Sequence, residues 1–72
     1  MKYVVIYEKS ATGYGAYVPD LPGLGVVGGT LEETRQLMKK GIDLHLQSLR
    51  EHGEAIPQPS SSSEEIEVPL TA

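Results

Sequence analysis

The residues able to do acid–base or metal chemistry are few in this 72-residue chain and do not form a group. Glu8 and Asp20, near the first two β-rich segments, would be the metal-binding carboxylates of a nuclease. Two-metal phosphoryl transfer needs several carboxylates around ions about 4 Å apart. However, Val4-Val5-Ile6 leaves no acid at the centre of the first segment, and Asp20 begins a turn in which an aspartate normally accepts hydrogen bonds from its own backbone. We therefore expect no catalytic residue and no metal site.

The histidines and glycines give no stronger indication of an enzyme. His45 falls within the apolar arc of a predicted helix, with no serine, cysteine or carboxylate spaced to work with it, so we expect a packed side chain. His52 falls at the end of that helix, where the helix dipole favours it. Gly23, Gly25 and Gly28 match the letters of a dinucleotide-binding motif, but no helix opens within them. We expect no cofactor and no enzymatic activity.

Four tyrosines fall on or beside predicted strands and are the best candidates for a binding surface: Tyr3, Tyr7, Tyr14 and Tyr17. Tyrosines on a sheet can stack on the bases of single-stranded RNA. They also anchor protein interfaces, because the ring is buried while the hydroxyl group stays hydrated. Since no basic groove is predicted beside them, we favour a partner or oligomer interface. An orphan RNA-binding protein or a vestigial nuclease fold remains the alternative.

The charge is divided unevenly along the chain. Residues 1–50 carry six basic and five acidic side chains, whereas residues 51–72 carry five acids and no base. Three of these acids, Glu64, Glu65 and Glu67, stand close together. An acidic segment gains nothing from phosphate neutralisation, which argues against direct nucleic-acid binding, but it suits a basic protein partner.

The elements that must position these side chains are three strands and a helix, followed by a fourth strand. β-Branched and aromatic residues predict strands. In the first strand, Val4 and Ile6 point to one face, while Tyr3, Val5 and Tyr7 point to the other. We expect strands at residues 3–8, 14–18 and 24–28, joined by a hairpin loop at 9–13 and a proline-rich turn at 19–23.

The helix has clear start and stop signals. Thr30 and Glu33 form a capping box, in which the threonine hydroxyl accepts the Glu33 amide and the glutamate reaches back to the cap. Apolar residues then recur on one broad arc as far as residue 49. We expect the helix to end near His52, with Gly53 adopting the left-handed conformation that follows many helices.

The last third contains a linker and then an alternating segment. Residues 54–63 are rich in proline and serine, which is typical of a flexible linker. Ile66, Val68 and Leu70 alternate with Glu65, Glu67 and Pro69 and predict a half-buried strand, which Pro69 confines to a sheet edge or a strand end. The resulting α+β order is β-β-β-α-β, an antiparallel meander, a crossover helix and a final strand that a right-handed crossover places parallel to the first. The helix covers one sheet face, and we expect the tyrosine-bearing face to be open.

Several motifs together resemble the HicB-like antitoxin family. Residues 14–23 read Tyr-Gly-Ala-Tyr-Val-Pro-Asp-Leu-Pro-Gly, and residues 29–33 read Gly-Thr-Leu-Glu-Glu. Residues 42–46 and 53–59 also follow the pattern of the family, in the same order and with short gaps. The family signature is concentrated in the turn formed by Pro19, Asp20, Leu21, Pro22 and Gly23.

The resemblance implies a partial ribonuclease H-like fold without a catalytic role. It further implies a small basic ribonuclease toxin, similar to HicA, as the partner whose active site is masked. Many members of the family carry a C-terminal DNA-binding module. No such module follows the last predicted strand here, so we expect no direct DNA binding.

The small size favours association between copies of the chain. A single domain spanning residues 1–72 buries only about 60% of its unfolded surface, and there is no cysteine to provide a disulfide. We therefore expect a homo-oligomer, either a dimer or a tetramer. The first apolar run is five residues long, too short for a signal peptide or a membrane span, and we expect a cytoplasmic protein.

Overall fold

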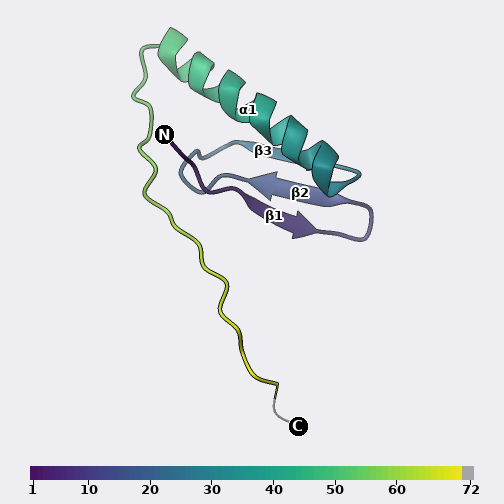
Figure 1. Cartoon of the computed structure of the whole chain (residues 1–72). Coiled ribbons are helices and arrows are strands. Elements are labelled where there is room, and N and C mark those ends of the chain that lie inside the picture. Colours follow the sequence, from purple (N-terminus) through teal and green to yellow (C-terminus); the bar gives the residue numbers. More distant parts are fainter. Residues whose placement is uncertain (71–72) are drawn as a thin grey trace.

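The structure, a computed structural model, describes residues 1–70 and contains a three-stranded sheet crossed by one long helix (Figure 1). The strands follow one another in the sheet in the order β1-β2-β3, and both neighbouring pairs are antiparallel. The predicted α+β class, meander and helix are therefore confirmed. The elements are β1 (Ile6–Lys9), β2 (Tyr14–Tyr17), β3 (Gly25–Gly28) and α1 (Leu31–Glu51).

The register of the strands shows which side chains face the helix. Tyr7, Ala16 and Val26 stand in one row across the sheet and pack in or against the core. The guanidinium carbon of Arg35, on α1, lies 6.0 Å from the centre of the Tyr7 ring. The prediction that Tyr3, Val5 and Tyr7 lie on the open face is thus wrong, because this set packs under the helix.

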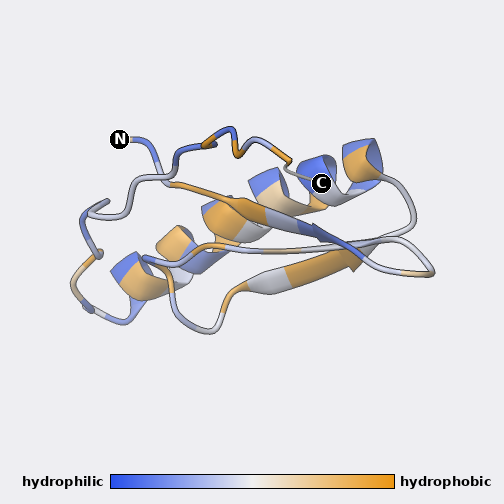
Figure 2. Ribbon diagram, turned by 90° about the horizontal axis from the view of Figure 1, so that it is seen from below, coloured by the Kyte–Doolittle hydropathy of each residue, from blue (hydrophilic) through white to orange (hydrophobic). Residues whose placement is uncertain are grey.

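The core lies between α1 and the helix-facing side of the sheet. Its buried apolar members are Ala16, Val18, Leu21 and Met38, with half-buried residues around them. Leu21, in the proline-rich turn, is completely buried, so this turn contributes to the core as well as reversing the chain. In Figure 2, seen from below, the helix runs behind the strands with its apolar residues interspersed among polar ones.

Helix α1 approaches β3 closely because a glycine faces it. A Cβ atom on Gly28 would lie 2.6 Å from the Thr34 hydroxyl oxygen and 3.0 Å from the Thr34 backbone nitrogen. Thr34 is fully buried, and its hydroxyl donates a hydrogen bond to the Thr30 carbonyl at 2.7 Å. The first turn of the helix can therefore rest directly on the end of β3.

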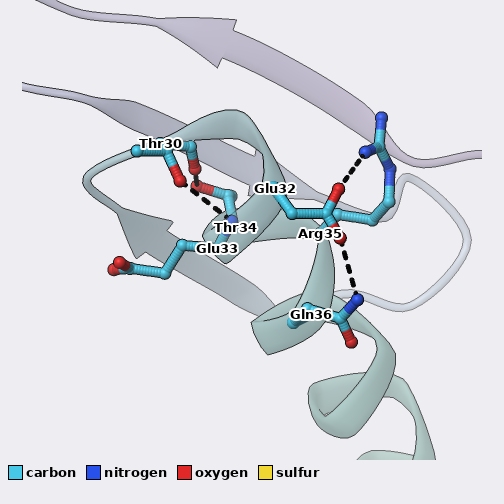
Figure 3. Close-up of polar contacts among 6 residues, drawn as sticks. All are labelled: Thr30, Glu32, Glu33, Thr34, Arg35 and Gln36. Carbon is cyan, nitrogen blue, oxygen red and sulfur yellow. Dashed lines mark hydrogen bonds and ion pairs between the residues drawn. The ribbon is translucent and has the colours of Figure 1, made fainter.

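Both ends of α1 carry the expected caps. The Glu33 amide donates to the Thr30 hydroxyl at 3.1 Å (Figure 3). The Glu33 carboxylate accepts from the Gly29 amide at 3.1 Å. The glutamate was predicted to reach back to Thr30, the N-cap residue, but it binds the amide of Gly29, one residue earlier. At the other end Gly53 has a φ of 66°, as predicted for the residue that follows the cap.

The predicted fourth strand is not paired in this chain. Residues 54–70 contain no helix or strand, and in Figure 1 they run from the end of α1 past the N-terminus and away from the sheet. We call residues 54–61 the strap and residues 62–70 the arm. The strap is held instead by hydrogen bonds to Tyr3 and Asp20, and the arm continues from it without joining the sheet.

Candidate protein-interaction surface

The strap is attached to the sheet at two places. The Tyr3 hydroxyl donates a hydrogen bond to the Pro57 carbonyl at 2.5 Å. Around it Ile56, Pro57 and Pro59 are half-buried, whereas the arm that follows is exposed throughout its length. The proline- and serine-rich composition predicted a linker, but did not indicate that part of it would rest on the body of the protein.

Asp20 makes the second attachment. Its Oδ2 atom accepts the backbone N–H groups of Ser60 and Ser61 at 3.0 and 2.9 Å, and its Oδ1 atom accepts their hydroxyl groups at 3.0 and 2.9 Å. The Ser61 amide, followed by the Ser60 amide, lowers the pKa of Asp20 to about 2, because these donors favour the ionised carboxylate. The expectation that Asp20 would bind its own turn is wrong, since its partners lie forty residues further along the chain.

The arm presents a strand-like pattern to solvent. Ile66, Val68 and Leu70 are 74%, 72% and 100% exposed. Glu64, Glu65 and Glu67, the acids predicted to meet a partner, are exposed as well and lie on this same segment. The structure therefore brings the predicted acidic residues together with an unprotected apolar row.

The open face of the sheet is a second exposed surface. Ile6, Tyr17 and Gly25 form one row across it, and Glu8, Gly15 and Val27 form the next. Tyr17 is 44% exposed and Val27 is 79% exposed. Of the four tyrosines, Tyr17 lies on this face, whereas the register places Tyr14 opposite Gly28 on the helix side. An interface role for the tyrosines stays a prediction.

Glu8 is separated from Asp20 in the structure. It lines a shallow hollow of about 600 Å³ at the hairpin end of the sheet, together with Lys9, Ser10 and Tyr14. Asp20 lies in the turn after β2, at the other end. Within residues 1–70, no three histidine, aspartate or glutamate side chains are grouped so that they could hold a metal ion.

A polar network supports the first turn of α1 (Figure 3). The Glu32 carboxylate accepts from Gln36 at 2.9 Å and pairs with Arg35 at 2.7 Å. The Gln36 amide, and then Arg35, lower the pKa of Glu32. Because Arg35 also lies over the Tyr7 ring, this network joins the exposed side of the helix to the sheet.

Among the helices in residues 1–70, none has the length and apolar character needed to cross a membrane.

Comparison with known proteins identifies a family. Residues 3–69 match the family model described as the HicB-like antitoxin of bacterial toxin–antitoxin systems. A UPF0150 protein of Thermoplasma acidophilum is 41% identical over 69 residues, which cover 94% of this chain and 97% of that protein. A 14.9 kDa protein from the rep-hol intergenic region of Haemophilus phage HP1 is 33% identical over 96% of this chain. The chain spans 52% of the phage protein.

Proposed function

Since the chain belongs to the HicB-like antitoxin family of bacterial toxin–antitoxin systems, we propose that it binds a small basic ribonuclease toxin and covers its active site. The observation that carries this proposal is the family match, which includes both the folded body and the arm. The similarity to the Thermoplasma protein extends over nearly all of both chains and supports the same assignment of family.

The contacts of Asp20 support binding in place of catalysis. Its two carboxylate oxygens are occupied by four donors from Ser60 and Ser61, and the low pKa keeps the group ionised. This is the arrangement of a structural clamp, because a carboxylate so engaged has little capacity left for a metal ion or a proton. We therefore propose that the protein is not an enzyme. Separately, we propose that it is cytoplasmic.

The arm is our choice for the first contact with the toxin. Three carboxylates on an extended, exposed segment attract a basic protein and raise the rate of encounter. Tyr17 and Val27 on the open sheet face add apolar area for a closer contact. A partial ribonuclease H-like ancestry remains part of this proposal, and it would explain a nuclease-like strand order without a nuclease site.

Co-expression with the basic protein encoded beside this chain tests the proposal. We expect a stable complex, seen by light scattering, and loss of RNA cleavage by the toxin. A variant with Glu64→Gln, Glu65→Gln and Glu67→Gln should bind at least tenfold more weakly at low salt. The matched control neutralises three exposed acids outside the arm, two on α1 and one at the start of the strap, Asp43→Asn, Glu51→Gln and Glu54→Gln, and should bind as the unchanged chain does.

Two results would contradict the antitoxin proposal. One is a chain that ignores the neighbouring basic protein and leaves RNA cleavage intact. The other is salt-dependent binding of RNA by the chain alone, which an RNA-binding protein would show and an antitoxin would not. An RNA titration at two salt concentrations distinguishes these cases.

A further inference from the structure

The chain exposes more surface than a folded monomer of its mass. Its accessible surface is 5665 Å², whereas a 7.8 kDa monomer is expected to expose about 4,400 Å². Its radius of gyration is 14.8 Å, against about 11 Å for a globular chain of this length. The excess of roughly 1,300 Å² is larger than the about 800 Å² that each partner buries in a standard interface.

The arm accounts for much of this excess and has the character of a strand without a sheet. Its apolar residues alternate with Glu65, Glu67 and Pro69, so that an extended backbone would place Ile66, Val68 and Leu70 on one side, and the proline confines such a strand to the edge of a sheet. All three are largely or fully exposed. Seven residues, from 64 to 70, would span about 23 Å as a strand, which is enough to run along all four residues of β1.

A suitable edge exists on β1, because β1 is the first strand of the sheet and pairs with β2 alone. In its own chain the arm is not paired with this edge, since residues 62–70 form no strand. Continuing the β1–β2 register brings Tyr3 opposite Asp20, so the strap crosses one end of the sheet between its contacts with these two residues. The arm then leaves the sheet, as Figure 1 shows.

We propose that the arm of one copy adds as a strand to the free β1 edge of a second copy, and that the two copies exchange arms. The predicted fourth strand is then supplied by the partner copy. Charge favours this occupant: β1 and the residues before it carry Lys2 and Lys9 against one acid, Glu8, so this edge is net basic, whereas the arm carries three acids. Pairing arm with arm would instead bring six glutamates together.

This proposal goes beyond the proposed function and is compatible with it. In a strand that buries Ile66 and Val68, Glu65 and Glu67 point to the opposite side and stay accessible to a basic protein. The exchange of arms would therefore hold Glu65 and Glu67 in a fixed position on the dimer. The oligomeric state of the chain alone tests the exchange without any toxin present, so failure of one proposal does not count against the other.

The first test uses the full-length chain and light scattering. The unchanged chain should have twice the mass of one copy. The variant Ile66→Asp, Val68→Asp should have the mass of one copy, with an unchanged helix signal by circular dichroism. The control variant Ser62→Asp, Ser63→Asp adds the same charge beside the apolar row and should remain a dimer. Equal masses for the unchanged chain and the Ile66/Val68 variant would overturn the proposal.

The second test identifies where the arm lies. The chain has no cysteine, so a Val4→Cys chain and a Glu67→Cys chain each carry one thiol. A short thiol cross-linker added to their mixture should join a Val4→Cys chain to a Glu67→Cys chain. An excess of the Ile66→Asp, Val68→Asp chain should not compete with this cross-linking. Failure to join the two chains would overturn the exchange. So would cross-linking of a Val4→Cys, Glu67→Cys double variant only at the mass of one copy.

Discussion

The folded body, residues 1–53, and the strap with its arm, residues 54–70, are held by different forces. In the body, four buried apolar side chains lie between α1 and the sheet, and both helix ends are capped. The strap is held by a part-buried Tyr3 hydrogen bond and by exposed Asp20 hydrogen bonds, and the arm lies exposed. One part is stabilised by burial, and the other is positioned by polar contacts.

This difference indicates how an antitoxin of this size can be both stable and adaptable. Apolar burial stabilises a fold in proportion to the area removed from water, whereas an exposed hydrogen bond exchanges readily with bonds to water and contributes less. We therefore expect the strap to detach from the body without unfolding it. The position of the arm relative to a partner can then change while the sheet and helix remain intact.

The largest effect should come from the core. Met38, on α1, is fully buried against the sheet, and Met38→Ala should lower the free energy of unfolding by about 2–5 kcal/mol, because it removes buried apolar volume and leaves a cavity. Urea denaturation followed by circular dichroism measures this. Leu44→Ala, at an exposed position of the same helix, is the control and should change stability by less than about 0.5 kcal/mol. Equal effects would contradict the assignment of the core.

The contact between helix and β3 gives a smaller effect. Gly28→Ala would put a Cβ atom 2.6 Å from the Thr34 hydroxyl, so the helix must shift, at a cost of about 1–3 kcal/mol. Gly29→Ala, at the next residue, meets no atom within 4 Å and is the matched control. The same denaturation experiment compares them. A Gly28→Ala variant as stable as the Gly29→Ala variant would mean that the helix does not pack this closely.

The N-cap should contribute less again. Thr30→Ala removes the hydroxyl that accepts the Glu33 amide, and should destabilise the chain by about 1 kcal/mol. Thr30→Ser keeps the acceptor and should restore most of this loss. If serine and alanine have the same effect at this position, the hydroxyl hydrogen bond is not the source of the stability.

Sequence reasoning performed well where one local rule acts alone. Strand propensity predicted the meander, and the spacing of Thr30, Glu33 and Gly53 predicted both ends of α1. It failed on the faces of β1, because Tyr3, Val5 and Tyr7 alternate with Val4 and Ile6 and both sets are apolar. With apolar residues on both sides, alternation alone cannot show which side the helix covers.

The candidate site was predictable in composition but not in position. The alternation of residues 64–70 indicated a strand, and their acids indicated a basic partner, yet neither pattern shows which edge the segment joins. Asp20 and its serine partners are separated by forty residues, and no local pattern links an aspartate in a turn to distant serines. The strap contact arises from the tertiary fold, which brings Tyr3, before the start of β1, and Asp20, in the turn after β2, next to the same segment.

Acid should release the strap from the body, while the core of the body stays folded. The lowered pKa of Asp20, about 2, means that its ionised form favours the attached strap. This stabilisation is fully present above the unfolded pKa near 3.9, and it is lost as the pH falls from about 4 to about 2. The Ser60 and Ser61 amide signals should then move, in NMR spectra, toward those of the exposed arm.

The variant Asp20→Asn separates charge from shape in this contact. It keeps the size of the side chain but removes the carboxylate that four donors share, so the strap signals should resemble the arm already at neutral pH. Asp43→Asn changes an exposed aspartate on α1 and is the matched control, with strap signals as in the unchanged chain. Strap signals unaltered by Asp20→Asn would show that the half-buried Ile56, Pro57 and Pro59 hold the strap by packing. The contrast between an apolar body and a polar strap would then be incorrect.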